Sequence, residues 1–156
     1  MPRARKVIPT TEGYDGTIGL VFDPTEPDEI RATVPVRDGL CNPFGIVHGG
    51  VYGSIAESLA TATTIYRVHR NGSAAIGMGN DTRLLRPISE GAIHASARAI
   101  HTGRTTWLWN VDFHDDADRL CTTSRLTIAI TAYEHPRRAA RADARPGGGA
   151  RDAAAR

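Results

Sequence analysis

One stretch of sequence decides the fold: residues 42–61, which read NPFGIVHGGVYGSIAESLAT. After its pair of glycines the apolar residues recur at intervals of three and four, which is the spacing of one face of an α-helix. The residues between them are small, and from His48 to Arg67 the only carboxyl group is that of Glu57. We therefore predict a helix from about Gly49 to His69 that is buried along most of its length.

Glu57 is the unusual residue of this helix. A single helical glutamate is most often a solvated surface residue, but a solvated helix face normally carries several charges. A buried carboxylate without a partner is costly, so its presence in a nearly uncharged helix suggests a function. Ser54, Glu57, Thr61 and Thr64 lie three and four positions apart, which predicts one narrow polar stripe along the helix.

The pair Gly49-Gly50 stands where this helix begins. A Gly-Gly pair is usually a turn, and a histidine such as His48 is more often a capping or core residue than a catalyst. A helix that opens with two glycines also exposes free N–H groups and allows a ligand to approach closely. Directed at a carbonyl oxygen, these N–H groups would act as an oxyanion hole. Together with one acid, they indicate acyl-transfer chemistry.

The ordered set His48-Gly49-Gly50, Glu57 and Thr61 resembles the hotdog-fold acyl-CoA thioesterases. The likeness is to the phenylacetate-pathway type and to the branch with a helix glutamate, which includes 4-hydroxybenzoyl-CoA thioesterase. The likeness covers about residues 15–133. It includes three further stretches: 84–87 (LLRP), 103–109 (GRTTWLW) and 119–127 (RLCTTSRLT). The resemblance implies an α+β hotdog fold, an antiparallel sheet wrapped around one long central helix, and hydrolysis of an acyl-CoA thioester.

The resemblance also implies roles for five residues. Glu57 would attack the thioester carbonyl or activate a water molecule that does so, and the sequence leaves both possibilities open. The Gly49 N–H would polarise the carbonyl oxygen, and Thr61 would bind the water or the carboxylate unless it is an ordinary helix residue. His48 would shape the loop. Asn42 matches a family position whose amide faces the thioester; the alternative is an asparagine that forms a turn before proline.

Coenzyme A would arrive as part of the substrate, so we expect no separate cofactor. Its phosphates need cations and hydroxyl groups, for which the resemblance suggests Arg86, Arg104, Thr105 and Thr106, with Asn80 beside the pantetheine arm. For each arginine the alternative is a solvated residue at a strand end. No metal site is expected, because the acidic run at 115–118 lacks the glycine and final glutamate of a calcium loop and is predicted to be a solvated turn.

The rest of the pattern predicts strands. Two runs precede the helix and four follow it: 18–22, 30–36, 74–85, 93–101, 105–114 and 119–132. Alternation in the fifth run places Trp107 and Trp109 on one face. Together with the resemblance to the branch with a helix glutamate, these aromatic residues suggest a preference for aromatic acyl groups. Two strands, a buried helix and a four-strand meander lead to the same hotdog architecture by pattern alone.

Composition limits the remaining possibilities. The 156 residues suffice for one domain, and the net charge of +2 comes mainly from arginines near the two ends, which does not favour nucleic-acid binding. Cys41 and Cys121 lack metal-site spacing, so a reduced, cytoplasmic state is the default. Neither a signal peptide nor a membrane span is predicted. We expect an irregular arm over 1–13, the thioesterase domain over 14–134, and a disordered basic tail over 135–156.

An open sheet edge invites pairing with another chain. In the resembled family two chains join their sheets and the sites form between subunits, which implies a homodimer or homotetramer in which Asn42 and Gly49 of one chain face Glu57 of another. Two alternatives stay open: a hydratase or dehydratase that acts on acyl thioesters, and a non-catalytic hotdog protein that binds CoA esters.

Overall fold

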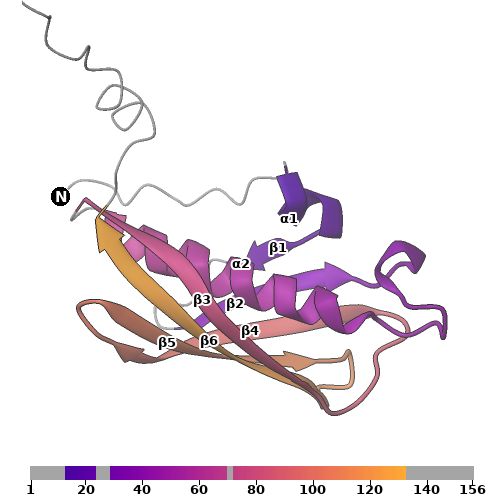
Figure 1. The fold of residues 1–156 in the computed structure, drawn as a ribbon. Coiled ribbons are helices and arrows are strands. Elements are labelled where there is room, and N and C mark those ends of the chain that lie inside the picture. Colours follow the sequence, from indigo (N-terminus) through magenta and orange to yellow (C-terminus); the bar gives the residue numbers. More distant parts are fainter. Residues whose placement is uncertain (1–12, 24–28, 70–71, 133–156) are drawn as a thin grey trace, which may run out of the picture.

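Six strands form one sheet that curves around a long helix in the computed structural model, which describes residues 13–23, 29–69 and 72–132 (Figure 1). The elements in chain order are α1 (Gly13–Ile18), β1 (Val21–Asp23), β2 (Glu29–Pro35), the 3-10 helix η1 (Asp38–Leu40), α2 (Gly49–Val68), β3 (Ser73–Leu84), β4 (Ala92–Thr102), β5 (Thr106–His114) and β6 (Leu120–Ala132).

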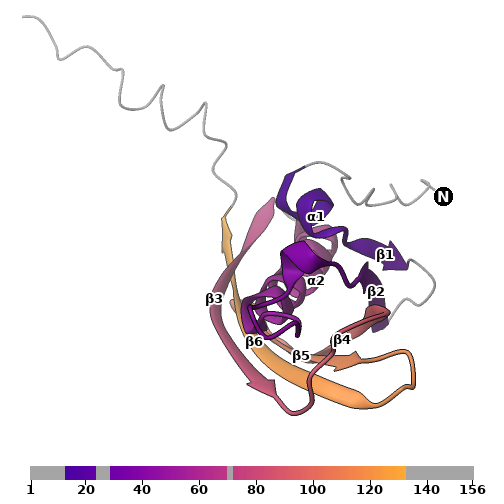
Figure 2. The ribbon, with the colours of Figure 1, turned by 90° about the vertical axis from the view of Figure 1, so that its right-hand side faces the viewer.

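The strand order is β1-β2-β4-β5-β6-β3, and every neighbouring pair is antiparallel. Strand β3 follows α2 in the chain but pairs with β6 and not with β4, so it is an edge strand and the predicted meander of four successive strands is wrong; of these four, only β4, β5 and β6 are neighbours in chain order. Figure 2, turned by 90°, shows the sheet wrapping α2 while α1 and β1 lie over the side that the sheet leaves open. The predicted hotdog architecture is confirmed.

The core fills the space between α2 and the concave face of the sheet. Alternate residues of β5 point inward and are almost fully buried, as the alternation predicted, and Phe113 packs edge-on against Tyr52 of α2 at a centroid distance of 5.3 Å. Ile55 and Leu59 of α2 are also fully buried. Burial raises the pKa of Tyr52 to about 12, so this hydroxyl group stays protonated.

The strands that follow α2 begin and end within one residue of the predicted runs, and so does β2. The first predicted strand, 18–22, is wrong in its first half. Ile18 ends α1, and Gly19 turns the chain with a φ of 75°, so the strand is only Val21–Asp23. The predicted arm falls almost wholly, and the tail entirely, outside the described residues, and the predicted domain limits stay predictions.

Helix α1 was not predicted. It has six residues, too few for a periodic pattern, and contacts with α2 hold it in place. The Tyr14 hydroxyl lies 3.0 Å from the Ser54 hydroxyl, and Ser58 donates a 2.6 Å hydrogen bond to Asp15.

Candidate active site

His48 caps the start of α2. Its backbone is extended (φ −65°, ψ 135°), and its Nδ1 accepts a 3.0 Å hydrogen bond from the Gly50 N–H, which places the ring proton on Nε2. The His48 carbonyl accepts a hydrogen bond from the Val51 N–H at 2.9 Å. None of the described residues accepts a hydrogen bond from the Gly49 N–H. The amide predicted to be an oxyanion donor is therefore left unpaired at the positive end of the helix dipole.

Glu57 lies on the face of α2 between α1 and the edge strand β3, and it is half-buried. Thr61 donates a 3.0 Å hydrogen bond to its Oε1. The carboxylate rests on the backbone of β3 at Gly77: a Cβ atom there would lie 2.7 Å from both Cδ and Oε2, and closer still to Oε1. The strand register shifts between Gly77 and Gly79. Because Gly77 has no side chain, the Glu57 carboxylate can lie directly against the backbone of β3 at this irregular point of the strand.

The predicted polar stripe is only partly correct. Ser54, Glu57 and Thr61 occupy the face that the sheet leaves open, but Thr64 is fully buried. Its hydroxyl donates to the Ala60 carbonyl at 2.7 Å and accepts from Trp109 Nε1 at 3.0 Å. Helical spacing correctly predicted the side of α2 on which Thr64 lies. It did not predict that the sheet covers this part of the helix.

Gly49 and Glu57 do not meet within one chain. They are eight residues apart on one continuous helix, which separates them by about 12 Å along its axis at 1.5 Å per residue. A single carbonyl group cannot touch both.

Asn42 forms a turn. Its Oδ1 accepts a 2.9 Å hydrogen bond from the Phe44 N–H, and its carbonyl accepts one of the same length from the Gly45 N–H. The Asn42 Nδ2 group has no acceptor among the described residues. The turn-forming alternative describes the geometry, and the amide donor stays free.

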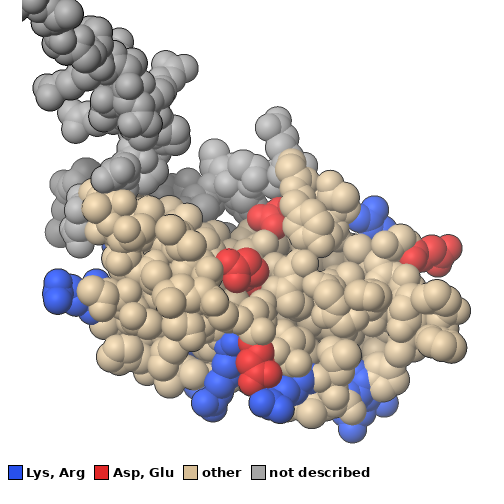
Figure 3. Space-filling view, viewed as in Figure 1, with Lys and Arg blue, Asp and Glu red and all other residues tan. Residues whose placement is uncertain are grey.

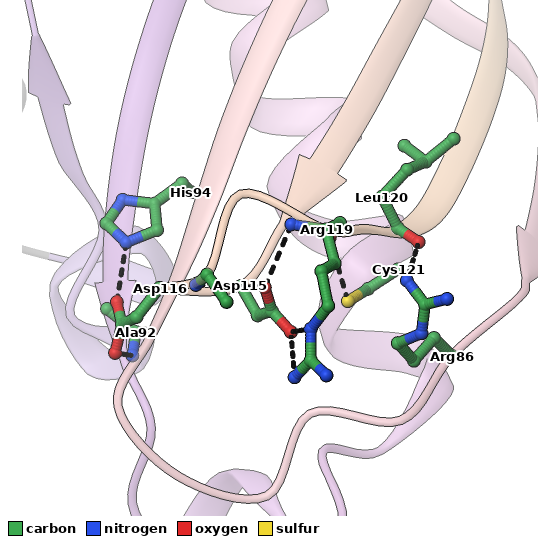
Figure 4. Close-up of polar contacts among 9 residues, drawn as sticks. Arg86, Ala92, His94, Asp115, Asp116, Arg119, Leu120 and Cys121 are labelled. Atoms are coloured by element: carbon green, nitrogen blue, oxygen red, sulfur yellow. Dashed lines mark hydrogen bonds and ion pairs between the residues drawn. The ribbon is translucent and has the colours of Figure 1, made fainter.

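The residues predicted to bind coenzyme A do not gather in one place. Arg86 Nη1 donates to the Leu120 carbonyl at 3.3 Å, beside the end of β5 that pairs with β6 at Leu120 (Figure 4). Arg104 and Thr105 are exposed in the turn at the other end of β5, where Thr106 begins the strand. Nine residues of extended strand separate these ends by about 30 Å.

Asn80 has a different environment from the one predicted. Its Nδ2 donates to the Gly53 carbonyl at 2.9 Å, and its Oδ1 accepts from the Thr82 hydroxyl at 2.9 Å. The Nδ2 bond joins β3 to α2, and the Oδ1 bond lies within β3.

An open groove of about 680 Å³ lies between α1, η1 and the first two turns of α2. Its lining includes Tyr14, Arg37, Cys41, His48 and Ser54. The Arg37 guanidinium donates to the Thr17 carbonyl of α1. Sequence reasoning missed this groove, because α1 has no periodic signal and nothing in the pattern links residue 14 to residue 37.

Comparison with known proteins identifies the family. The sequence profile of the Thioesterase superfamily matches residues 44–122. The chain belongs to this superfamily. It is 33% identical over 129 residues to the Mycobacterium tuberculosis protein Rv1847, covering 81% of this chain and 92% of that protein. It is 32% identical over 113 residues to the proofreading thioesterase EntH of Cronobacter sakazakii, covering 72% and 82% of the two chains.

Solved structures agree with this assignment. A mutant of the Pseudomonas aeruginosa thioesterase PA1618 superimposes with a TM-score of 0.74 at 30% identity, covering 76% of this chain and 86% of that one. The Haemophilus influenzae thioesterase HI1161 gives 0.73 at 30% identity, covering 78% and 85%. The predicted enzyme class is confirmed: the protein is a thioester hydrolase.

A second polar cluster of this thioesterase, in the β5–β6 turn, is structural (Figure 4). The Asp115 carboxylate accepts hydrogen bonds from Arg119 Nε at 2.8 Å and from the N–H groups of Ala117 and Arg119. These bonds, led by the Arg119 side chain, lower the pKa of Asp115 to about 2. The predicted solvated turn is therefore wrong at Asp115, whose side chain is 10% exposed.

Two further properties concern only the described ranges. They contain no group of three or more His, Cys, Asp or Glu side chains arranged to hold a metal ion. None of their helices combines the length and apolar character needed to cross a bilayer. Cys41 and Cys121 are both free thiols, and burial raises the pKa of Cys121.

Proposed function

We propose that this thioester hydrolase acts on acyl-CoA, with Glu57 as the nucleophile or general base and the Gly49 N–H as the oxyanion donor. One observation carries the proposal: the only acid of α2 is held against the Gly77 backbone by Thr61, on the face that the sheet leaves open. A carboxylate that served stability alone would be expected to have a cationic partner, and no ion pair of Glu57 occurs among the described residues.

The chemistry follows from these two groups. The Gly49 N–H and the helix dipole stabilise the negative charge that develops on the thioester oxygen. Glu57 either attacks the carbonyl carbon and expels the CoA thiolate, leaving an anhydride that water hydrolyses, or it removes a proton from an attacking water. Thr61 binds Oε1, which leaves Oε2 available for either role.

We place the site between two copies of the chain. The 12 Å separation on α2 supports this arrangement, because a carbonyl bound at Gly49 needs a carboxylate that its own helix cannot supply. The unpaired edge of β3 exposes Ile76 and Met78, at 55% and 68%. The surface over α2 carries few charges, and the charged groups of this face gather lower in the view (Figure 3), where β3 carries the exposed pair Asp81 and Arg83. A homodimer joined along β3, or a tetramer of two such dimers, would bring Gly49 and Asn42 of one chain toward Glu57 of its partner.

Replacing Gly49 by proline tests the oxyanion role. Proline lacks the N–H group, is accepted at the first helical position, and suits the extended conformation of the preceding His48. We expect kcat to fall about 10²–10³-fold. Gly49→Ala is the matched control, because it adds the same Cβ next to Leu84 and keeps the N–H group. Equal activity in the two variants would exclude this amide as the donor.

Mixing inactive subunits tests the shared site. Glu57→Gln removes the acid and Gly49→Pro removes the amide, so each homodimer lacks one group at both sites. A mixed dimer has one complete site if the two groups come from different chains. Unfolding and refolding an equimolar mixture should then restore about one quarter of the wild-type activity. No recovery from a mixture that contains mixed dimers, as verified by two different tags, would exclude the shared site.

Coenzyme A would be bound from both ends of the sheet under this proposal. Arg86 lies at one end of β5, whereas Arg104, Thr105 and Thr106 lie at the other, so a shared site would draw on one group from each chain. Asn80 keeps one Nδ2 hydrogen and one Oδ1 lone pair beyond its bonds to Gly53 and Thr82, and we propose that these contact the pantetheine arm. Because CoA esters are intracellular, we propose a cytoplasmic location.

An aromatic acyl group is one proposed substrate class, although Trp107 and Trp109 do not support it. They are 9% and 0% exposed, and both pack beside Arg67 near the other end of α2. A panel of aromatic and aliphatic acyl-CoA esters, followed with a thiol-reactive dye, decides this point. The same assay separates the alternatives: thiol release that is unchanged in Glu57→Gln contradicts the mechanism, and hydration of an enoyl-CoA without thiol release indicates a hydratase.

A further inference from the structure

We propose that the groove beside the start of α2 receives the acyl group of the substrate and selects acyl groups that end in a carboxylate, which Arg37 binds. This inference rests on the proposed acyl-CoA hydrolysis and adds to it a substrate class and a specificity residue.

Charge is the first argument. Arg37 is the only charged residue of the groove lining in the described part of the chain, and no aspartate or glutamate lines the groove. Its guanidinium contacts the Thr17 carbonyl, and it forms no ion pair with any described acid. A guanidinium has five N–H donors in a planar fork that matches a carboxylate, so several of them remain for a ligand.

Position is the second argument. His48 and Gly50, the neighbours of Gly49 on either side, both line the groove. The groove therefore opens beside Gly49, and an acyl chain that leaves a carbonyl held at the Gly49 N–H could enter it. The phosphates of coenzyme A lie a whole pantetheine arm away from the thioester sulfur. An anion that Arg37 meets inside this groove is for that reason part of the acyl group.

Shape is the third argument. The groove has an apolar floor of Ile18, Leu40 and Val51, each less than 10% exposed. Arg37 is exposed at its edge, and the Tyr14 and Ser54 hydroxyls already bond to each other. Its volume of about 680 Å³ is in the usual range for small-molecule sites. A short methylene chain would cover the floor, and its terminal carboxylate would reach the Arg37 guanidinium.

Two matched substrates test the proposal. Glutaryl-CoA carries a terminal carboxylate, and pentanoyl-CoA has the same chain length with a methyl group instead. We expect the wild-type enzyme to show a kcat/KM ratio for glutaryl-CoA over pentanoyl-CoA of at least about tenfold, the effect of one charge-assisted hydrogen bond. Arg37→Gln should bring this ratio close to one. Arg31→Gln is the control, because Arg31 pairs with Glu29 on β2 outside the groove, and it should leave the ratio unchanged.

The outcomes separate the possible anions. If Arg37 binds a CoA phosphate, Arg37→Gln weakens both esters equally and leaves the ratio unchanged, which overturns the proposal. The corresponding N-acetylcysteamine thioesters carry no phosphate, so a glutaryl preference that persists with them supports an acyl carboxylate site. If the wild-type kcat/KM ratio of glutaryl-CoA to pentanoyl-CoA is near one, the carboxylate-site proposal is overturned. The proposed acyl-CoA hydrolysis is not overturned by that result if thiol release still depends on Glu57.

Binding provides the readout if the wild-type enzyme hydrolyses neither of these two esters. Calorimetry with the Glu57→Gln variant measures the Kd of glutaryl-CoA and pentanoyl-CoA directly. Tighter binding of glutaryl-CoA that is lost when Arg37→Gln is added supports the carboxylate site. Equal binding of the two esters overturns it.

Discussion

The close contact between the Glu57 carboxylate and the backbone of β3 leads to a specific prediction for Gly77. An alanine there would place its Cβ 2.7 Å from Glu57 Cδ, whereas ordinary contacts begin at 3.4 Å, so the carboxylate must retreat by at least about 0.7 Å. The strand backbone of β3 is bonded to β6 and cannot move as easily as the end of a side chain. The displaced carboxylate would also change its hydrogen bond to Thr61, which is 3.0 Å long.

The size of the effect follows from how strictly acyl transfer depends on geometry. A misplacement of about 1 Å can cost 10²-fold in rate. We expect Gly77→Ala to lower kcat by about 10²-fold and to change KM much less, because the acid moves while the binding surfaces stay. The fold should not suffer, since alanine is favoured over glycine inside a strand by about 0.5–1 kcal/mol.

Gly79→Ala is the matched control for Gly77→Ala. It lies two residues along the same strand, and no heavy atom lies within 4 Å of the position its Cβ would take. Steady-state hydrolysis of acyl-CoA, thermal unfolding and gel filtration should be measured for both variants. Near wild-type kcat in Gly77→Ala, with its fold and association state intact, would refute the assignment of Glu57 as the reacting acid.

Three more predictions concern the scaffold. The pKa of Asp115 lies below its ordinary value, so its contribution to stability is complete above about pH 4 and disappears as the pH falls toward 2. Asp115→Asn should therefore lower the urea midpoint at pH 7 and match the wild type near pH 2; a constant difference would contradict this. Thr64→Val leaves the buried Trp109 N–H unpaired and should reduce the free energy of unfolding by about 1–3 kcal/mol, measured by urea titration, whereas an unchanged value would exclude this hydrogen bond as a net contributor. Met78→Lys places a charge on the β3 edge and should shift the protein to a smaller species in gel filtration, and an unchanged elution volume would argue against pairing along β3.

Periodicity explains why most of the fold could be predicted. Helix α2 is long and nearly uncharged, and β5 alternates strictly, so local sequence and tertiary packing favour the same structure. Helix α1 could not be predicted, because six residues are too few to show a periodic pattern and because its contacts come from residues about 40 positions away. The burial of Thr64 could not be predicted either. Helical spacing shows on which side of α2 a residue lies, but not how far the sheet extends over that side.

The candidate site was predictable as a set of residue types and much less as a geometry. The lone acid and the glycine pair stand out in a helix that has no other carboxylate. Nothing in the sequence distinguishes Gly77, which supports that acid, from Gly79, where an added Cβ would meet no heavy atom within 4 Å. The two predicted CoA-binding arginines are only 18 positions apart in the chain, yet an entire strand separates them in space. Chain distance could not reveal this, because antiparallel strands return the chain to either end of the sheet.

In the proposed function, catalysis and association would both depend on one element, β3. This strand supplies the backbone on which Glu57 rests, and it is also a sheet edge with no neighbouring strand in the described part of the chain. A second chain that pairs with β3 would therefore arrive beside the acid. In the proposed mechanism the acid needs an amide donor, which its own helix holds about 12 Å away, and a two-fold partner would present an identical helix start. The same pairing that closes the sheet edge would in this way complete the site, and the isolated chain would retain both groups without a complete site.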